Sequence, residues 1–228
     1  MGGILELAVR YRDEGADELV FYDITASPEG RSVDRTWISR VAAELDIPFC
    51  VAGGIRSAQA AEEVLAAGAD KISINTPALE NPKLIDELAR RFGSQCVVAS
   101  VDARRVEPGP DGKPRWEIFT HGGRRATGID ALDHAARVAG LGAGELLVTS
   151  MDGDGTKKGY DLELTRTIAD MVSVPVIASG GAGAVGDFAP AVEAGADAVL
   201  AASIFHYNEF SIPDTKAYLA ARGVPVRL

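Results

Sequence analysis

The sequence repeats itself at one fixed spacing, and this feature limits the possible folds more than any other. Four sets of residues recur 127 positions later along the chain: Gly15-Ala16 at Gly142-Ala143, Glu18 at Glu145, Gly53-Gly54 at Gly180-Gly181, and Gly68-Ala69-Asp70 at Gly195-Ala196-Asp197. A single offset across the whole first half means that the chain contains two copies of one structural unit.

Within each copy, short apolar runs alternate with amphipathic runs. The expected strands are 19–24, 48–53, 71–75, 96–102, 145–150, 175–179 and 198–203. They show little alternation between apolar and polar residues, as parallel strands covered on both faces should. The expected helices are 4–14, 34–45, 57–67, 81–92, 128–140, 161–172, 186–194 and 213–221. This order predicts an α/β fold, a (βα)₈ TIM barrel made of two half-barrels.

The repeat also predicts that one barrel strand is missing from these 228 residues. The second copy opens with strand 96–102, whose counterpart would lie before residue 1, whereas helix 128–140 corresponds to helix 4–14. We therefore expect 1–228 to form a single, N-terminally truncated barrel domain with seven strands and eight helices, where a closed barrel has eight of each. The two unpaired edges could close on each other, stay open, or be filled by another chain.

A longer interruption, 103–127, follows the strand at 96–102. Its Pro- and Gly-rich stretch VEPGPDGKP reads as a turn, and WEIFTHGG reads as a short strand. We expect a small β-hairpin over the mouth of the barrel.

Composition excludes some classes of partner. The chain has 23 basic and 33 acidic residues, a net charge of −10, which argues against a general surface for nucleic acids or anionic membranes. We find neither a signal peptide nor an apolar run long enough to span a membrane, so a cytoplasmic protein is expected. Cys50 and Cys96 each lie in an apolar run and are expected to be buried, reduced thiols in core strands.

In a (βα) barrel the chemistry gathers at the carboxyl ends of the strands. There, Gly53-Gly54 lies beside Asn75-Thr76, and a second glycine cluster that includes Gly180-Gly181 lies beside Ser203. Glycines let the backbone approach an anion closely, and a following helix N-terminus adds a favourable dipole. The alternative is that these glycines only turn the chain, but two repeat-related clusters favour two phosphate sites. A substrate with two phosphates is expected.

Asp102 ends an apolar strand, so its carboxylate must be paired or lie at the mouth. We interpret it as a general acid or base; the alternative is a salt bridge to Arg104 or Arg105.

A further polar set at the strand ends could hold ribose hydroxyls or a ring: Asp23, Thr25, Ser27, Thr149, Ser150, Asp152 and Asp154. The spacing of Asp152 and Asp154 invites a calcium-loop reading, but no acidic residue follows at the required distance, and we expect no metal site. None of His121, His134 and His206 has a nucleophile partner in sequence, and none is assigned a role.

At the opposite pole, Glu18, Lys71 and Glu145 begin three strands. From composition alone, a structural ring of ion pairs is the favoured interpretation.

Eight stretches together resemble the cyclase subunits of imidazole glycerol phosphate synthases, and the resemblance covers essentially the whole chain. They are DELVFYDITAS, GGIRS, GADKISINT, FGSQCVVASVDARR, THGGRRATG, GAGELLVTSMDGDGTKKGYDLELTR, PVIASGGAG and GADAVLAASIFH. The isomerase of the same histidine pathway shares the fold and the two sites for a substrate with two phosphates. SMDGDGTKKGYDLELTR and the hairpin stretch point to the cyclase instead.

The resemblance implies a lyase/cyclase reaction of histidine biosynthesis that needs no cofactor. Ammonia would attack the bisphosphorylated phosphoribulosyl-formimino aminoimidazole carboxamide ribonucleotide, giving imidazole glycerol phosphate and aminoimidazole carboxamide ribotide. A partner glutaminase, docked on the lower pole as a heterodimer, would deliver the ammonia through the barrel interior.

The resemblance also implies residue roles, which replace the ion-pair interpretation of the lower pole. Asp102 would be one of two catalytic aspartates. Glu18, Lys71 and Glu145 would gate the ammonia entrance, with Asp70 at the partner interface. One phosphate site would comprise Gly53, Gly54, Asn75 and Thr76, and the other Ser179, Gly180, Gly181 and Ser203. Asp23, Thr149 and Asp154 would lie near the substrate.

The sequence departs from the family pattern at two places. The family opens with a strand reading roughly C-L-D-V, which carries the other catalytic aspartate and a gate arginine, and then a loop lysine. Ala52 also replaces a glycine usual beside the first phosphate site. We expect the chain as written to bind phosphates better than it catalyses. The alternatives are a cyclase, an impaired fragment that binds phosphorylated ligand or the glutaminase, and the related isomerase.

Overall fold

The computed structural model describes residues 3–23, 35–110, 112–120 and 123–228. The candidates Thr25, Ser27 and His121 lie outside the described residues, as do residue 24 of the first expected strand and residue 34 of the second expected helix.

One sheet of nine strands forms the centre of the fold. Its strands are β1 (Leu19–Tyr22), β2 (Phe49–Ala52), β3 (Lys71–Ile74), β4 (Val97–Val106), β5 (Arg115–Thr120), β6 (Arg125–Asp130), β7 (Glu145–Ser150), β8 (Val176–Ser179) and β9 (Ala198–Leu200). Seven of them pair in parallel in the order β1-β2-β3-β4-β7-β8-β9. β5 and β6 extend β4 as an antiparallel hairpin.

Helices follow the parallel strands and cover their outer face. They are α1 (Ile4–Asp13), α3 (Arg35–Ala42), α4 (Ala58–Ala66), α5 (Thr76–Glu80), α6 (Lys83–Phe92), α7 (Ala131–Gly140), α8 (Leu162–Ala169), α9 (Phe188–Glu193), α10 (Ser203–His206) and α11 (Ile212–Ala220). Short 3₁₀ turns at Ser94–Cys96 and Val185–Asp187 complete the described elements.

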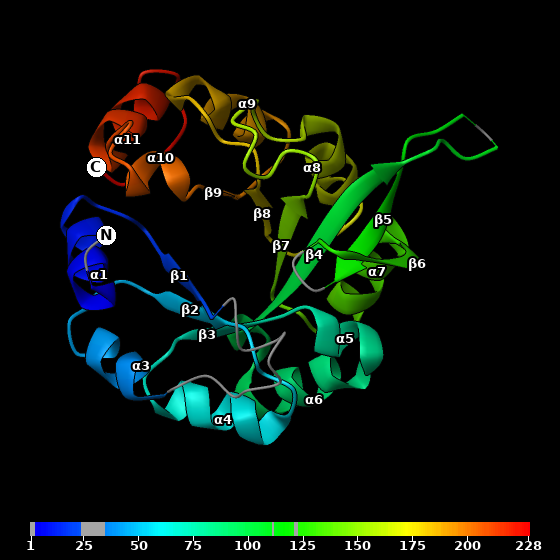
Figure 1. The fold of residues 1–228 in the computed structure, drawn as a ribbon, viewed down its shortest axis with the longest axis horizontal. Helices are drawn as coiled ribbons and strands as arrows, with labels where there is room; N and C mark the ends of the chain where they lie inside the picture. The colour runs from blue at the N-terminus through cyan, green and yellow to red at the C-terminus, as the bar shows by residue number, and fades with distance from the viewer. Residues whose placement is uncertain (1–2, 24–34, 111, 121–122) are drawn as a thin grey trace.

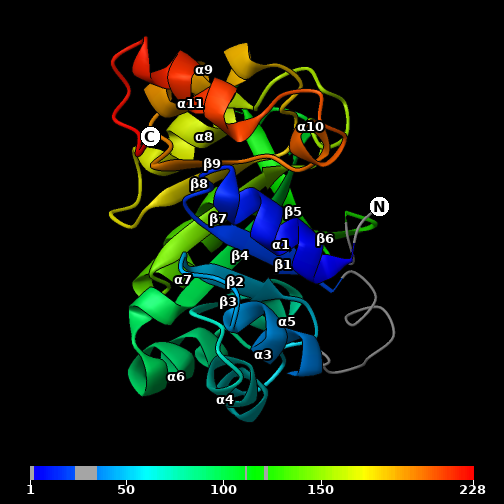
Figure 2. The same cartoon turned by 90° about the vertical axis from the view of Figure 1, so that its left-hand side faces the viewer.

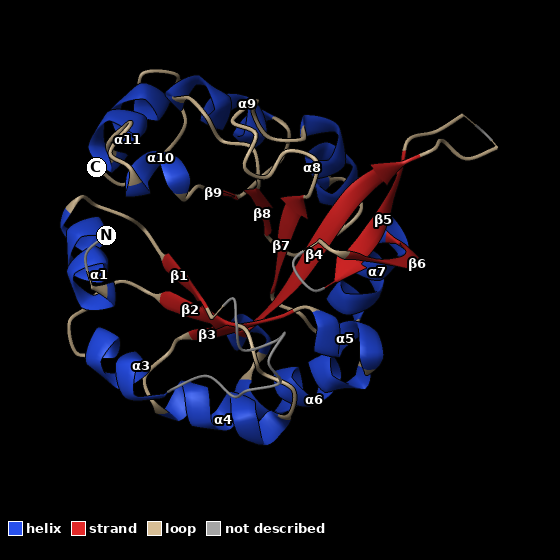
Figure 3. Cartoon of the chain, in the orientation of Figure 1, coloured by secondary structure: helices blue, strands red, loops and turns tan. Residues whose placement is uncertain are grey.

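The parallel sheet curls into an incomplete ring, with the strands inside and the helices outside (Figure 1 and Figure 2). Within the described residues, β1 and β9 form the two ends of the hydrogen-bonded order and do not pair with each other. This is the α/β architecture of a (βα)₈ TIM barrel, and seven parallel barrel strands were expected from the sequence. Figure 3 shows the hairpin β5–β6 projecting from the far side of this ring.

Alternate residues along each strand separate the two faces of the sheet. Phe21 points outward, where its ring lies 5.5 Å from that of Trp37 on α3 and 5.8 Å from that of Phe49. The main apolar cluster fills this layer between strands and helices. Because both faces of the inner strands are covered, their sequences read as nearly continuous apolar runs.

The sequence repeat is a structural repeat. The Asp70 carboxylate accepts a hydrogen bond of 3.0 Å from the backbone N–H of Phe49, and its counterpart Asp197 accepts one of 2.9 Å from Val176. Both aspartates therefore satisfy the first backbone donor of a neighbouring strand.

Several boundaries differ from those expected. The short helices α5 and α10 were not predicted, so the eight expected helices are too few. The helix expected from 128 begins only after Asp130, whose carboxylate caps α7 by accepting from Leu132 and Asp133. β9 ends at Leu200 rather than 203, since α10 starts at Ser203.

The two cysteines differ in their surroundings. Both thiols are free; Cys50 is buried in β2, as expected, whereas Cys96 is only partly buried and ends a 3₁₀ turn. The prediction that both lie buried in core strands was therefore wrong for Cys96. No helix among the described residues is long and apolar enough to cross a membrane.

His134 should make the fold sensitive to acid. It is 4 % exposed on α7, and its Nε2 has no hydrogen-bond partner among the described residues. Burial, and then the nearby charge of Arg137, lowers the pKa of His134 from 6.5 to about 4. The unfolded chain therefore takes up this proton at higher pH than the folded one. The contribution of neutral His134 to the free energy of unfolding is therefore complete above pH 6.5 and is lost as the pH falls from 6.5 through about 4.

We expect this proton to lower the free energy of unfolding by about 2–3 kcal/mol at pH 4.5 relative to pH 7. Urea unfolding of the chain and of His134→Leu at both pH values measures it, since the variant lacks this one titration. Parallel loss of stability in both proteins would show that His134 does not titrate in this way.

Candidate functional site

The interior of the curled sheet is built in layers. Six strands contribute one apolar layer: Val20, Cys50, Val98, Leu147, Ile177 and Leu200. Since side chains two positions apart on a strand share a face, the next inward residues toward the carboxyl ends can be assigned. Tyr22, Thr149 and Ser179 come next on their strands, and Asp102 lies two steps beyond Val98, so the interior changes from apolar to polar at the mouth.

Three of these polar residues lie side by side. Asp102 on β4 is in register with Thr149 on β7, and Thr149 is in register with Ser179 on β8. A carboxylate and two hydroxyls thus follow one another across three neighbouring strands. This brings together candidates from three separate stretches of sequence.

Asp102 is held by an amide rather than by a cation. Nδ2 of Asn75 donates a hydrogen bond of 2.7 Å to Oδ2 of Asp102. Burial raises the pKa of Asp102 from 3.8 to about 6, against the effect of the Asn75 bond and with a smaller contribution from the charge of Asp154. A carboxyl group with this pKa exchanges protons near neutral pH, as a general acid or base must.

The alternative salt bridge of Asp102 is not what the structure contains. Arg104 lies 3.6 Å from Asp152, and Arg105 pairs with Glu163 at 2.7 Å. The side chain of Asn75, which the resemblance places at a phosphate site, donates a hydrogen bond to Asp102.

Sequence reasoning missed Tyr22. It points inward from β1, two residues after Val20, yet it is 49 % exposed because β1 is an edge strand. A tyrosine phenol is protonated at neutral pH, so Tyr22 can donate a hydrogen bond into the mouth. Its position two residues beyond an inward apolar residue was the signal that could have identified it.

The repeated glycines have a packing role that is plain in the structure. A Cβ on Gly53 would lie 2.4 Å from the carbonyl oxygen of Asp23, and one on Gly180 would lie 2.6 Å from that of Ser150. Both glycines have positive φ, 103° and 85°. Each cluster therefore lets the strand end approach a neighbouring backbone, which is the alternative role considered for them. Gly54 is also at positive φ and is buried.

Gly181 offers a test of this close approach. A Cβ there would lie 2.0 Å from the carbonyl oxygen of Gly159, at φ 111°. We expect Gly181→Ala to lower the free energy of unfolding by about 1–3 kcal/mol, because the loop around Gly159 must move. Gly155→Ala is the matched control, since its φ is also positive, 73°, but nothing lies within 4 Å of its Cβ. Equal losses in urea unfolding would mean that backbone conformation alone, and not the contact, is responsible.

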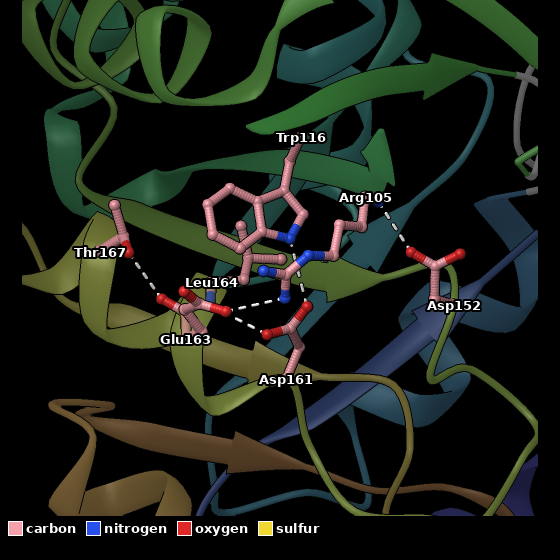
Figure 4. Close-up of polar contacts among 7 residues, drawn as sticks. All are labelled: Arg105, Trp116, Asp152, Asp161, Glu163, Leu164 and Thr167. Atoms are coloured by element: carbon pink, nitrogen blue, oxygen red, sulfur yellow. Dashed lines mark hydrogen bonds and ion pairs between the residues drawn. The ribbon is translucent and has the colours of Figure 1, made fainter. Parts of the chain in front are cut away.

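The loop that carries Asp152 and Asp154 is hydrogen-bonded to β4, where β4 pairs with the hairpin (Figure 4). Oδ2 of Asp152 accepts a 2.7 Å hydrogen bond from the backbone N–H of Arg105. The guanidinium of Arg105 lies over the ring of Trp116, 5.4 Å from its centroid, and reaches Glu163 at the start of α8. These contacts hold the loop that carries Asp154, whose negative charge contributes to the raised pKa of Asp102.

The remaining mouth candidates lie at element ends. Asp23 follows β1 and donates its backbone N–H to the carbonyl of Ala52. Ser203 is the first residue of the four-residue helix α10. Thr76 begins α5 and lines a pocket of about 260 Å³ against the hairpin, together with Thr120, Arg125 and Thr127. Among the described parts of the chain, no three His, Cys, Asp or Glu residues lie close enough to hold a metal ion.

The opposite pole holds a compact charged cluster. Nζ of Lys71 donates hydrogen bonds of 2.6 Å to both Glu18 and Glu145. Burial alone would lower the pKa of Lys71, but the bonds to Glu145 and Glu18 outweigh it and raise that pKa. The ion pairs that composition alone suggested among Glu18, Lys71 and Glu145 are therefore present.

A comparison with known protein families identifies the family of the chain. The family model for histidine biosynthesis proteins matches residues 1–211. This match spans nearly the whole chain and includes all seven parallel strands and every candidate residue named above. The chain belongs to the histidine biosynthesis protein family, whose members are enzymes of that pathway.

Proposed function

We propose that this chain is the cyclase subunit of an imidazole glycerol phosphate synthase. The observation that carries the proposal is one barrel interior with a distinct polar group at each end. Asp102, whose pKa is about 6, lies at the carboxyl ends of the strands, and Lys71 with two carboxylates lies at the amino ends. An isomerase rearranges a single substrate at the mouth, whereas a reaction that consumes ammonia needs a second entrance.

A polar stripe supports passage between the two ends. Lys71 and Ser73 share the inward face of β3, and Asn75, just after the strand, reaches Asp102. Oγ of Ser73 and Oγ of Ser100 lie 2.7 Å apart in a hydrogen bond, one layer below Asn75 and Asp102. Hydroxyls can both donate to and accept from ammonia, so this stripe offers it successive partners through an otherwise apolar layer.

In this proposal each group acts as its chemistry allows. Asp102 serves as general acid or base toward the bisphosphorylated ribonucleotide. The two glycine clusters, with Thr76 and Ser203 beside them, hold the phosphates. Thr149, Asp154 and Asp23 contact the ribose or the ring. The glutaminase docks at the lower pole and delivers ammonia past Lys71. Asp70 contributes to this interface and also accepts the hydrogen bond from the backbone of Phe49.

Two assays run in parallel test the proposal. One measures ammonia-dependent conversion of the phosphoribulosyl-formimino ribonucleotide to imidazole glycerol phosphate, and the other measures isomerisation of its aldose precursor. Turnover in the first assay alone supports the cyclase, and turnover in the second alone makes the chain an isomerase. If neither reaction occurs but the ribonucleotide raises the melting temperature, the chain is a phosphate-binding protein without turnover.

The partner is tested separately. Glutamine replaces ammonia in the first assay, with and without a purified glutaminase subunit. A heterodimer by size exclusion and glutamine-dependent product are expected. A mixture that elutes as two separate proteins would remove the partner from the proposal and leave the ammonia-dependent activity untouched.

A further inference from the structure

The hydrogen-bond ladder between β4 and β7 ends on a side chain. Its last backbone bond runs from the N–H of Met151 to the carbonyl of Ala103, at 2.8 Å. In a parallel ladder the carbonyl of Met151 would next accept from the N–H of Arg105. That N–H donates instead to Oδ2 of Asp152, at 2.7 Å (Figure 4). A carboxylate thus takes the place of a strand carbonyl, so the chain can leave the sheet at Met151 while the donor on β4 stays paired.

The chain turns sharply where it leaves the sheet. The backbone N–H of Asp154 donates to the carbonyl of Ser150 at 2.9 Å, and that of Gly153 donates to Oγ of Ser150 at 3.2 Å. Asp152 lies in the middle of this turn. The two bonds to Ser150 set the shape of the turn, whereas the bond between Asp152 and Arg105 fixes its direction relative to β4.

Asp154, at the end of the turn, is a neighbour of two candidate groups at the mouth. Its negative charge contributes to the raised pKa of Asp102, so these two carboxylates lie within electrostatic reach of each other. Its Cβ lies 3.4 Å from the place that a Cβ on Gly180 would take, in the second glycine cluster. A small shift of the turn would therefore change the distance from Asp154 to both groups.

The other end of this loop is held by separate contacts. The backbone N–H of Gly159 donates to the carbonyl of Gly181 at 2.8 Å. Asp161, which caps α8, accepts a hydrogen bond of 3.2 Å from Nε1 of Trp116 on β5. Because these contacts do not involve Asp152, a substitution of Asp152 can displace the turn without loosening the start of α8.

Asp152 holds the turn as a hydrogen-bond acceptor rather than as a charge. Its side chain is 48 % exposed and its ion pair with Arg104 is 3.6 Å long, so this pair contributes little. Asparagine has the same shape and keeps a side-chain oxygen that can accept from the N–H of Arg105, whereas alanine has no acceptor. The two substitutions therefore separate the hydrogen bond from the charge.

We propose that Asp152 is a positioning residue for the reaction proposed above. It does not itself touch the substrate; its bond to the backbone of β4 sets the place of Asp154 at the mouth. This inference rests on the proposed function for the identity of the ligand that Asp154 meets.

A double-mutant cycle tests this role. Asp152→Ala is expected to lower kcat/KM for the phosphoribulosyl-formimino ribonucleotide by about 10- to 100-fold, since a shift of about 1 Å in a positioned group has effects of this size. Asp154→Ala should lower kcat/KM at least as much. Since Asp152 acts through Asp154, the double variant should be no worse than Asp154→Ala alone. Asp152→Asn, the matched control, should stay within about threefold of the original chain because it keeps the acceptor.

Hydrogen exchange and affinity separate this inference from the cyclase assignment. Exchange at the amide of Arg105 should become faster in Asp152→Ala but not in Asp152→Asn. Calorimetric affinity for the ribonucleotide should follow the same cycle and needs no turnover, so a chain that binds without reacting loses the cyclase assignment alone. Additive losses in the cycle, equal losses in Asp152→Asn and Asp152→Ala, or an affinity unchanged by Asp152→Ala would overturn the role of Asp152. A chain that does not bind the ribonucleotide would overturn both proposals.

Discussion

Asp102→Asn is expected to lower kcat by about 10²–10⁴-fold, the contribution typical of a positioned acid or base. The amide keeps the size of the side chain and its partner Asn75 but cannot exchange a proton. The rate of the unaltered chain should change with pH around 6, the pKa of Asp102, and this inflection should be absent from the residual rate of the variant. Ammonia-dependent turnover between pH 5 and 8 measures both.

The same substitution should stabilise the fold at neutral pH. Burial raises the pKa of Asp102 from 3.8 to about 6, so the folded chain binds this proton more tightly than the unfolded chain. The contribution of protonated Asp102 to the free energy of unfolding is therefore complete below pH 3.8 and is lost as the pH rises through about 6. Each pKa unit corresponds to about 1.4 kcal/mol. Removing the charge should therefore raise the free energy of unfolding by about 3 kcal/mol above pH 6.

Asp170→Asn is the matched control for both measurements, since Asp170 is an exposed carboxylate at the C-terminal end of α8. It should change neither turnover nor stability. Unchanged turnover in Asp102→Asn would remove Asp102 from the chemistry. A loss of stability at pH 7 would show instead that the charged pair with Asn75 stabilises the fold.

Lys71→Met is expected to lower the free energy of unfolding by about 3–5 kcal/mol. The substitution removes the cation that pairs with both Glu18 and Glu145, and the side chains of these carboxylates are only 27 % and 19 % exposed. Two partly buried negative charges would then face each other without compensation. Urea unfolding at pH 7 measures the loss, with the exposed Lys83→Met as the control.

Adding Glu18→Gln and Glu145→Gln to Lys71→Met should restore most of the stability, because no unpaired charge then remains. If the single variant is as stable as the original chain, the cluster contributes nothing to the fold and only a functional role would explain it. Comparing ammonia-dependent turnover of the triple variant with that of the original chain separates the two contributions.

The strands were the most predictable part of this fold. Each of the seven parallel strands lies in an apolar run of sequence, because both of its faces are covered and few of its positions tolerate a polar side chain. Helices α5 and α10 were not predictable in the same way, since five and four residues contain too little periodicity. Their formation depends on the strand ends from which they start.

The candidate site was predictable in its residue types but less so in its contacts. Strand ends identified Asp102, Thr149 and Ser179, and the register of three strands brings them together. The bond from Asn75 to Asp102 depends on the relative positions of β3 and β4, which a single sequence does not specify. Tyr22 was missed because a tyrosine in an apolar strand resembles a core residue until the inward face of the strand is known.

The paired aspartates Asp70 and Asp197 bear on the order in which the chain folds. Each bonds the start of a strand that lies 21 residues earlier, β2 in one half and β8 in the other. Each bond therefore closes one βαβ unit using contacts that are short in sequence, and such contacts form before distant ones. The two halves can begin to fold independently, each around its own unit, and the later step is their joining along β3 and β4.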